Sequence, residues 1–443
     1  MPDRKIRLGV LAVFILAAFI GAYFYLTGGR AKLSVEAVTG PQPELSQPEQ
    51  RLVPTVSIAK AVGWRTGSAP LPATGLSVKA FAENLDHPRW MLVLPNGDVL
   101  VAETNQPLRK SDGIRGWATR TAMNWVGAGV PSANRITLLR DTNGDGVADR
   151  RSILIKDLNS PFGMALAGDK LYVGNTDLLV RFPFTVGQTR IDARPEKILS
   201  LPGGGHWTRN VVASADGSKI YVAVGSLTNI ADKGIEVEAN RANILEVDAK
   251  TGDYRIYAAG LRNPIGMAWE PATRQLWTVV NERDEMGGDL VPDYLTAVQF
   301  GGFYGWPWYY WGGYTDKRVP EPEQDMRQYT IRPDYALGPH VAALGLSFAE
   351  GAKLGPRFAD GAFIGLHGSW NRKPKSGYKV IFVPFAKGRP VGKPIDVLSG
   401  FLNADEEAQG RPVGVAIDGK GALLVADDVG NKIWRVTAKQ QAQ

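Results

Sequence analysis

His206 is the side chain best placed in this sequence to transfer a proton. It follows Gly203-Gly204-Gly205, which allows close backbone approach, and it opens a run of apolar residues typical of a β-hairpin. An imidazole exchanges its proton near neutral pH and can act as a general base. A lone histidine is more often structural, so His206 is a candidate base with that alternative left open.

Arginines stand at comparable positions, at the entries to apolar hairpins. The guanidinium fork matches carboxylates, so several arginines that converge on one channel would bind an anionic ligand. The alternative is that each arginine pairs with an Asp or Glu of a neighbouring hairpin. The candidate donors are Arg89, Arg209, Arg262 with its neighbour Asn263, Arg372 and Arg411.

A calcium-loop pattern begins at Asp141. Asp141, Asn143, Asp145 and Asp149 match the first nine positions of a loop with oxygen ligands at alternate residues, but the twelfth position is Ser152 instead of a glutamate. The pattern therefore predicts either a weak structural calcium site or a plain turn of Asp, Asn and Gly residues.

Several other chemistries are excluded by what the sequence lacks. It has no cysteine, which excludes disulfides, thiol catalysis, zinc ribbons and iron–sulfur clusters. It has no G-x-G-x-x-G after a strand, no G-x-S-x-G and no H-E-x-x-H. The net charge is +7, and the first 32 residues, with five basic residues against one acidic, carry more than half of it. The remainder is too weakly basic to predict nucleic-acid binding.

The elements that would position these residues repeat along the chain. A polar turn, an apolar strand, a Gly/Asp/Asn turn and a second apolar strand recur six times. Six such hairpins predict an all-β fold, a six-bladed propeller over residues 76–438 whose opening loops face one end of a channel. Two separate β-sandwiches are the alternative. The copies span residues 85–104, 158–177, 206–226, 261–282, 340–370 and 410–428.

The N-terminal residues predict a membrane anchor. Residues 8–27 are uncharged and apolar, about the length that crosses a bilayer as a helix, and three basic residues precede them. We therefore expect residues 1–30 to contain one transmembrane helix in the inner membrane, with the propeller in the periplasm. A cleaved signal peptide, with export of the rest, is the alternative. Residues 31–75 hold six prolines and predict a tether, and residues 439–443 a short tail.

Two motifs give the sequence a family resemblance. Gly260-Leu-Arg-Asn-Pro-Ile-Gly266, followed about 35 residues later by Gly301-Gly-Phe-Tyr-Gly-Trp-Pro307, resembles the soluble glucose/sorbosone dehydrogenase family over residues 76–438. The segment from His367 to Arg372, which includes Trp370 and Asn371, agrees with its L-sorbosone dehydrogenase-like branch. Members of that family are six-bladed propellers that use pyrroloquinoline quinone (PQQ) and calcium.

The resemblance implies roles for individual residues. His206 would be the base that takes a hydroxyl proton while hydride passes from an aldose or aldehyde sugar to the quinone. PQQ would be bound by Arg262, Asn263 and Arg411, with Arg89, Arg209, Arg372, Trp370 and Asn371 as further cofactor contacts. Backbone carbonyls of Glu282, Arg283 and Asp284 would hold the catalytic Ca²⁺.

One departure from the family bears on activity. The glucose enzymes carry an aspartate that orients the catalytic histidine, and Ser226 stands at the matching position here. A serine adds no negative charge, so it would raise the basicity of His206 less than a carboxylate would.

The sequence therefore predicts a PQQ- and calcium-dependent sugar dehydrogenase anchored to a membrane, with a respiratory quinone or cytochrome as a possible electron acceptor. Two alternatives stay open. One is a propeller that binds a ligand or protein without catalysis. The other is a calcium-dependent lactone hydrolase, which would need channel carboxylates around one metal, and the candidates are Glu103, Asp177, Glu282 and Asp427.

Overall fold

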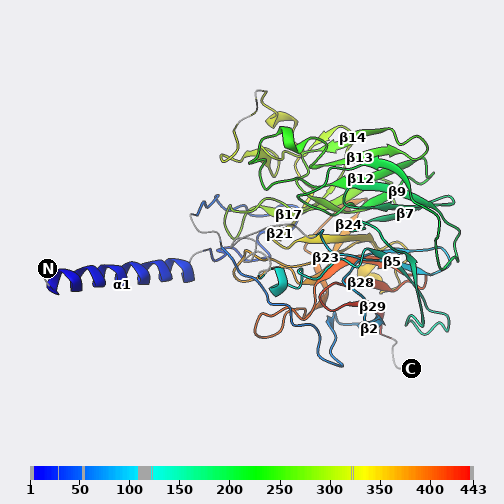
Figure 1. The fold of residues 1–443 in the computed structure, drawn as a ribbon, viewed down its shortest axis with the longest axis horizontal. Coiled ribbons are helices and arrows are strands. Elements are labelled where there is room, and N and C mark those ends of the chain that lie inside the picture. The colour runs from blue at the N-terminus through cyan, green and yellow to red at the C-terminus, as the bar shows by residue number, and fades with distance from the viewer. Residues whose placement is uncertain are drawn as a thin grey trace.

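Six antiparallel sheets form the main body of the protein, which is a six-bladed β-propeller (Figure 1). The computed structural model describes residues 4–27, 29–51, 55–107, 121, 123–320, 322 and 324–439. The innermost strands of successive blades contact one another in turn, and the innermost strand of the sixth blade contacts that of the first. The predicted all-β, six-bladed fold is confirmed.

Each blade is built on four strands, which run from the channel outward in the following order. They are β3 (Pro88–Val93), β4 (Val99–Glu103), β5 (Arg135–Arg140) and β6 (Arg150–Ile155); β7 (Met164–Ala167), β8 (Lys170–Gly174), β9 (Leu178–Pro183) and β10 (Glu196–Ser200); β11 (Val211–Ala213), β12 (Lys219–Val224), β13 (Asn243–Asp248) and β14 (Tyr254–Ala259); β15 (Pro264–Trp269), β16 (Leu276–Val280), β17 (Pro292–Ala297) and β21 (Tyr335–Pro339); β22 (Ala343–Phe348), β23 (Gly361–Leu366), β24 (Lys379–Ala386) and β26 (Ile395–Ser399); and β27 (Pro412–Ile417), β28 (Leu423–Asp427), β29 (Lys432–Ala438) and β2 (Leu76–Ala82).

The six repeated hairpins are the two inner strands of the six blades. Their second strands are almost continuously buried, as in β12 and β16, because each blade is covered on both faces by its neighbours. This is why the sequence shows short apolar runs rich in Val, Ile and Leu instead of a strict alternation.

The ring is closed by pairing the two ends of the propeller. Strand β2 lies outermost in the sixth blade and runs antiparallel to β29, with Leu76 opposite Ala438 and Ala80 opposite Trp434. Residues 433–436 of β29 thus lie opposite β2, which is the strand that closes the ring.

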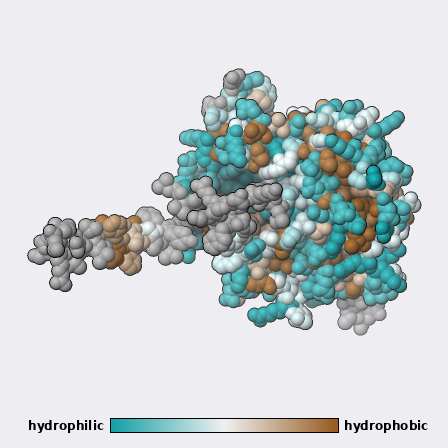
Figure 2. All heavy atoms as spheres, viewed as in Figure 1, coloured by the Kyte–Doolittle hydropathy of each residue, from teal (hydrophilic) through white to brown (hydrophobic). Residues whose placement is uncertain are grey.

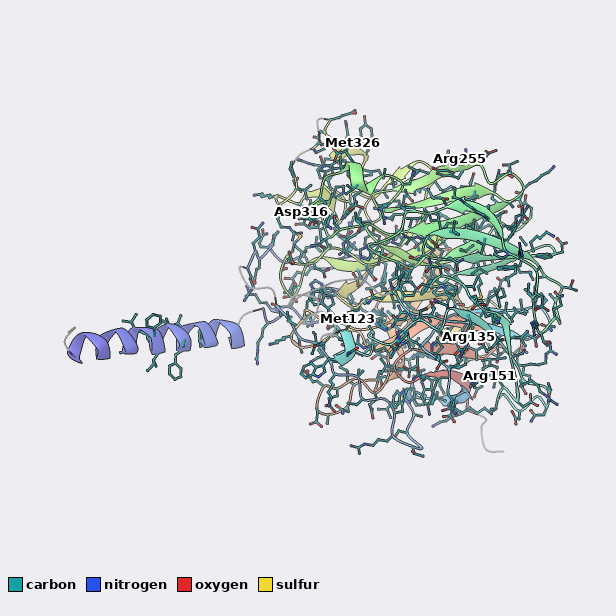
Figure 3. The ribbon with its side chains drawn as sticks, in the orientation of Figure 1. Met123, Arg135, Arg151, Arg255, Asp316 and Met326 are labelled. Atoms are coloured by element: carbon teal, nitrogen blue, oxygen red, sulfur yellow. The ribbon has the colours of Figure 1, made fainter. Side chains whose placement is uncertain are left out.

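A long excursion separates β17 from β21. It carries the short strands β18 (Gly302–Phe303), β19 (Tyr309–Tyr310) and β20 (Tyr314–Thr315) and the 3-10 turn η2 (Arg327–Tyr329). Asp316 and Met326 lie on it, at the upper left of the propeller in Figure 3. Most of the aromatic run from 303 to 311 is buried, so these rings pack the fold. The remaining short elements are η1 (Glu236–Glu238), η3 (Pro356–Phe358), β1 (Leu71–Pro72), which pairs with β26, and β25 (Arg389–Pro390).

Residues 29–51 and 55–64, which we call the strap, lie on the propeller instead of hanging free. Ala31 N donates to Lys373 O at 2.7 Å, Glu49 N to Met286 O at 3.0 Å, and Ser57 N to Trp370 O at 2.7 Å. Most of the segment predicted as a tether is thus fixed to the blades by backbone hydrogen bonds. The division into anchor, tether, propeller and tail stays a prediction, and the tail beyond Lys439 is outside the described residues.

Helix α1 (Arg4–Thr27) covers the segment predicted to cross a membrane and stands away from the blades (Figure 1). In the described part of the chain, no helix meets the length and apolarity needed to span a bilayer. The transmembrane assignment is therefore not supported by the structure. Large apolar side chains of α1, among them Phe14, Leu16 and Phe19, are exposed, and its described residues are brown in Figure 2.

Candidate active site

The candidate site lies at the end of the propeller where the inner strands begin. In an antiparallel blade the first strand starts at the edge where the second one ends, so residues at these two positions meet. His206 precedes β11, Arg262 precedes β15 and Asp284 follows β16, while His340 precedes β22 in the next blade. These four side chains line one cavity of about 150 Å³.

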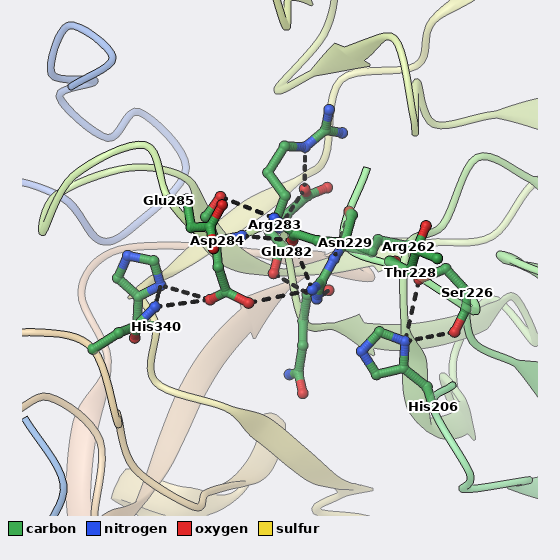
Figure 4. A network of polar contacts seen from close by, with 12 residues as sticks. His206, Ser226, Thr228, Asn229, Arg262, Glu282, Arg283, Asp284, Glu285 and His340 are labelled. Atoms are coloured by element: carbon green, nitrogen blue, oxygen red, sulfur yellow. Dashed lines mark hydrogen bonds and ion pairs between the residues drawn. The ribbon is translucent and has the colours of Figure 1, made fainter. Parts of the chain in front are cut away.

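His206 is held as a neutral imidazole in one tautomer. Its Nδ1 lies 2.8 Å from the backbone oxygen of Ser226 and 3.2 Å from Ser226 Oγ (Figure 4). A carbonyl oxygen can only accept a hydrogen bond, so Nδ1 carries the proton and Nε2 keeps its lone pair. Burial lowers the pKa of His206 to about 3, and the charge of Arg262 adds to this shift. The imidazole is therefore unprotonated at neutral pH, as a general base must be.

Ser226 contacts the imidazole at the position where the resemblance places an aspartate. Its hydroxyl donates to Thr228 O at 2.7 Å, which leaves the oxygen lone pairs for the Nδ1 proton of His206. Ser226 thus orients the ring without adding charge.

Two glycines allow this close contact. A Cβ on Gly225 would lie 2.3 Å from Asn263 Oδ1 and 2.6 Å from His206 Cβ. Gly205 has a φ of +60°, and a Cβ there would lie 2.4 Å from Leu227 Cα. Side chains at these two positions would force His206 away from Ser226.

Arg209 is fully buried and holds the backbone of the loop that carries His206. Its guanidinium donates to the backbone oxygens of His206 at 2.7 Å, Thr208 at 2.8 Å and Pro202 at 2.6 Å. Burial lowers the pKa of Arg209 to about 9. The structure therefore turns this predicted cofactor contact toward the backbone.

Arg262 uses all five of its N–H groups within the chain. Nε donates to Asn229 O at 3.2 Å, and Nη2 donates to Asn229 Oδ1 at 2.9 Å and Asp284 Oδ2 at 3.3 Å. Nη1 donates to the backbone oxygens of Glu282 at 2.8 Å and Asn281 at 3.4 Å. Arg262 holds the loops of the third and fourth blades together, whereas the Oδ1 of its neighbour Asn263 is buried without a partner among the described residues.

The loop predicted to hold the catalytic calcium is already occupied by donors. Glu282 O accepts from Arg262, and Asp284 O accepts from Arg318 Nη1 at 2.9 Å and Asn229 Nδ2 at 3.2 Å. The Arg283 side chain points away, to Pro307 O at 2.7 Å and Tyr309 O at 2.6 Å. Within the described ranges, no three His, Asp or Glu side chains converge to hold a metal ion. This donor set does not fit Ca²⁺.

The far wall of the cavity is a network that sequence reasoning did not single out. Asp284 Oδ1 lies 3.5 Å from His340 Nδ1 and accepts from Asn371 Nδ2 at 2.9 Å. Burial alone would raise the pKa of Asp284, but His340 and Arg262 outweigh it and lower the pKa to about 2. Asp284 in turn raises the pKa of His340 against the opposing effect of burial. His340 opens the fifth repeat much as His206 opens the third. Its place at the start of a repeat was the sequence feature that could have identified it.

Asp293 is a second residue that the sequence reasoning missed. It lies in β17, lines the cavity, and accepts from the backbone N–H of Glu282 and of Ala342, both at 2.8 Å. Burial raises the pKa of Asp293 to about 7. A single aspartate inside the apolar stretch 290–298 was its only sequence signal.

The first, fifth and sixth blades contribute a separate buried cluster around Asp428. Its Oδ2 pairs with Arg89 Nη1, lies 2.9 Å from His367 Nε2 and 3.5 Å from His87 Nε2. Burial would raise the pKa of Asp428, but these partners lower it strongly, while burial lowers the pKa of His87 to about 4. Arg89 thus pairs with an acid of the neighbouring blade, although its buried Nε has no partner in the described chain.

Arg411 and Arg372 differ in how many donors remain. Arg411 makes one side-chain hydrogen bond, from Nη2 to Ala59 O at 3.2 Å, and its buried Nε has no partner among described residues. Arg372 donates to Gly288 O at 2.9 Å and Pro374 O at 3.0 Å, and pairs with Asp289 at 3.2 Å. Arg411 therefore retains capacity for a ligand, whereas Arg372 is committed to the fold.

Trp370 and Asn371 follow β23 at the mouth of the site. Both line the cavity in front of His206 and also a second cavity beside the strap. They are the predicted cofactor contacts that lie farthest toward the strap.

The calcium-like loop at 141–149 lies outside this site, and its carboxylates face the chain's own donors. Asp141 Oδ2 accepts from Lys420 Nζ at 2.9 Å, and Asp149 Oδ1 accepts from Thr142 N at 2.8 Å. Asn143 and Asp145 bond one another and the turn backbone. The Lys420 ammonium pairs with Asp141 at the position where the loop would bind a cation. These contacts do not test the structural calcium site, which stays a prediction.

Three of the four carboxylates named for a lactone hydrolase are likewise occupied by the chain's own donors. Glu103 pairs with Arg135, labelled in Figure 3, at 2.8 Å, and Glu282 pairs with Arg283 at 3.0 Å. Asp427 accepts from Trp64 Nε1 at 2.6 Å and Trp434 Nε1 at 3.0 Å. With Asp177, they form no metal-holding group among the described residues.

Comparison with known proteins gives a consistent picture. The TrAA12-like family model matches residues 70–292 and 317–439. The aldose sugar dehydrogenase YliI of Escherichia coli (strain K12) is 32% identical over 142 residues, 32% of this chain and 35% of that protein. A pyrroloquinoline quinone-dependent pyranose dehydrogenase of Coprinopsis cinerea is 23% identical over 292 residues, 55% of this chain and 39% of that protein. The matches thus span just over a third of the length of these two relatives.

Solved structures share the fold. The Trichoderma reesei protein of Carbohydrate-Active Enzymes family AA12 superposes with a TM-score of 0.68 at 18% identity, covering 87% of this chain and 100% of that one. The PQQ domain of the Coprinopsis cinerea pyranose dehydrogenase superposes with a TM-score of 0.65 at 19% identity, covering 86% of this chain and 100% of that domain.

Proposed function

This chain belongs to the TrAA12-like family, and on that premise we propose that it is a quinoprotein that oxidises an aldose or related aldehyde sugar. An aldose sugar dehydrogenase and a PQQ-dependent pyranose dehydrogenase among the relatives support an oxidoreductase. The observation that carries the proposal is His206, whose Nδ1–H is fixed by Ser226 while Nε2 belongs to a neutral imidazole that lines a cavity.

The unpartnered groups at the end of the propeller where the inner strands begin fit PQQ, although of these only Asn263 lines the cavity in front of His206. The buried Nε atoms of Arg89 and Arg411 lack partners in the described chain and would bind its carboxylates, and Asn263 Oδ1 would accept from a donor. When bound, PQQ supplies the two-electron acceptor that no side chain can provide. Because the loop at 282–284 does not fit Ca²⁺, we derive no step through calcium.

The protein's own contribution is to take a proton. His206 Nε2 would accept the proton of the substrate hydroxyl, and Ser226 keeps the ring oriented throughout. Burial and the charge of Arg262 oppose positive charge on the imidazole and outweigh the favourable effect of Asp284, so that the pKa of His206 is lowered. His206 therefore releases the accepted proton readily.

The proposal is tested by titrating protein purified without cofactor with PQQ and then measuring sugar-dependent reduction of a redox dye. We expect saturable binding and dye reduction with aldoses. Saturable binding of PQQ with no dye reduction by any aldose would contradict the oxidation and favour a non-catalytic propeller.

Replacing Arg411 by alanine should weaken PQQ binding by about 1.5–3 kcal/mol, the usual size for hydrogen bonds to charged groups. The Tm without cofactor should barely change, because Arg411 makes one hydrogen bond within the described chain. Arg372→Ala is the matched control: it should lower the Tm, because that guanidinium holds Gly288, Pro374 and Asp289. An unchanged affinity for PQQ in Arg411→Ala would remove Arg411 from the cofactor site.

We also propose that α1 attaches the propeller to the inner membrane, on the periplasmic side, with a respiratory quinone or cytochrome as electron acceptor. The support is the exposed apolar surface of α1 and the basic residues before it.

A variant that starts at residue 31 should stay in the soluble fraction with an unchanged Tm, because the described side chains of α1 are exposed and contribute nothing to the core. The full chain should sediment with membranes in the same fractionation. A full chain that stays in the supernatant, or a shortened one that aggregates, would count against the proposed anchor.

A further inference from the structure

We propose that the cavity between the strap and the mouth of the active site is a second carbohydrate subsite, so that the substrate is a reducing disaccharide or longer sugar. This inference rests on the proposed function and adds the size of its substrate. The two cavities meet at Trp370 and Asn371, which line both of them. A sugar whose reducing unit faces His206 would therefore extend into the second cavity.

The strap forms one wall of this second cavity, which has a volume of about 200 Å³. Glu49, Arg51 and Thr55 of the strap line it on one side. Hydrogen bonds from Glu49 N to Met286 O at 3.0 Å and from Ser57 N to Trp370 O at 2.7 Å fix this wall on both sides of the opening. The family match begins at residue 70, so the strap adds this wall to the matched region.

Asn371 offers a buried acceptor that the described part of the chain leaves without a donor. Its side-chain amide donates through Nδ2 to Asp284 Oδ1 at 2.9 Å, and a carboxylate can only accept, so the orientation of the amide is fixed. Asn371 is 7% exposed, and its Oδ1 has no partner among the described residues. A buried acceptor without a partner costs free energy, and a ligand hydroxyl would satisfy it.

Trp370 offers a flat apolar surface beside that acceptor. It is 43% exposed, which is unusual for so large a side chain at a concave site. An indole face packs well against the C–H face of a sugar ring. Its backbone oxygen accepts from Ser57 N at 2.7 Å, so the strap holds the residue that carries this surface.

The charges around the cavity favour an uncharged, hydroxyl-rich ligand. Glu49 and Glu285 supply acceptors, and Arg51 supplies donors. Glu49 pairs through Oε2 with Arg51 Nη2 at 3.2 Å and through Oε1 with Lys32 Nζ, which lies outside the lining, so neither sign of charge dominates. An apolar face surrounded by groups of both polarities suits a pyranose ring better than an anion or a cation.

The subsite is tested first by calorimetric titration of PQQ-free protein with glucose, maltose and cellobiose. We expect at least one disaccharide to bind about tenfold more tightly than glucose, the ratio that one additional hydrogen bond of typical strength supplies. Trp370→Ala should abolish this advantage, and Trp370→Phe, which keeps a ring, should restore part of it.

The second measurement uses PQQ-loaded protein and compares kcat/KM for the disaccharide with kcat/KM for glucose. Glu49→Gln should lower that ratio several-fold, because it removes a charged acceptor from the strap wall. Glu44→Gln is the matched control, since Glu44 is an exposed strap residue outside the cavity lining. It should leave the ratio unchanged.

Disaccharides that bind no more tightly than glucose, with a ratio insensitive to Glu49→Gln, would overturn the subsite while leaving glucose oxidation intact. Conversely, Trp370-dependent binding of a disaccharide to a protein that oxidises no sugar would support the subsite and contradict the proposed oxidation. The two failures are therefore distinguishable.

Discussion

Replacing His206 by alanine is expected to lower sugar turnover by about 10²–10⁴-fold, the usual contribution of a positioned general base. The reason is that Nε2 of His206 is the lone pair proposed to take the hydroxyl proton, and its neighbour Ser226 could not replace it, because Ser226 Oγ is turned to Thr228 O. PQQ affinity should stay within a few-fold, because the proposed cofactor donors are Arg89 and Arg411. Turnover is measured by dye reduction at saturating PQQ, and undiminished turnover would remove His206 from the mechanism.

The pH profile separates a base from a merely structural histidine. Since burial lowers the pKa of His206 to about 3, protonation should abolish activity only as the pH falls toward that value. Ser226→Asp should move this acid limb upward, because a carboxylate beside Nδ1–H stabilises the charged imidazole. Ser226→Ala is the control: it keeps the backbone acceptor at 2.8 Å and should keep the limb. A limb that Ser226→Asp does not move would assign it to another group.

Removing residues 1–82 is expected to abolish cooperative unfolding of the propeller. Strand β2 buries Leu76, Phe81 and Ala82 and supplies the outer partner of β29. Full burial of a large apolar side chain contributes about 1.5–3 kcal/mol, so this loss alone approaches the net stability of about 5–15 kcal/mol typical of folded proteins. The measurement is thermal unfolding followed by circular dichroism, beside the variant that starts at residue 31.

A rearranged chain provides the control for this deletion. Residues 70–82 appended after Lys439 through a short Gly/Ser linker should restore the transition, because Leu76 lies opposite Ala438 and a short connection can join β29 to β2. If the shortened chain unfolds as cooperatively as the full one, β2 does not close the ring.

The propeller could be predicted from the sequence because its inner hairpins are local. Each repeat holds both strands of a hairpin within about 20 to 30 residues, and the turn residues between them are visible in the sequence. The closure by β2 could not be predicted, because it depends on pairing Leu76 with Ala438 at opposite ends of the chain. The strap was interpreted as a tether because its hydrogen bonds come from backbone groups, such as Ser57 N, that no side-chain pattern reveals.

The candidate site was predicted in part for a similar reason. His206 and Ser226 lie in one hairpin, so the repeat that brings them together is readable. By contrast, the hydrogen bonds of the Arg262 side chain depend on Asn229 and Asp284, which come from different loops. Composition shows that arginines are present, but only the fold decides that Arg262 is fully occupied while Arg411 keeps an unpartnered Nε among the described residues.

The pairing of β2 with β29 also fixes the order of events during synthesis. Strand β2 leaves the ribosome about 350 residues before its partner β29 is synthesised. The last blade therefore cannot be completed until translation has ended. Closing a loop of that length costs about 5 kcal/mol of chain entropy, and the burial along the new blade must offset it. The two ends then form a hydrogen-bonded clasp that does for this cysteine-free chain what a disulfide between its termini would do. Such a clasp holds equally well in an oxidising and in a reducing compartment.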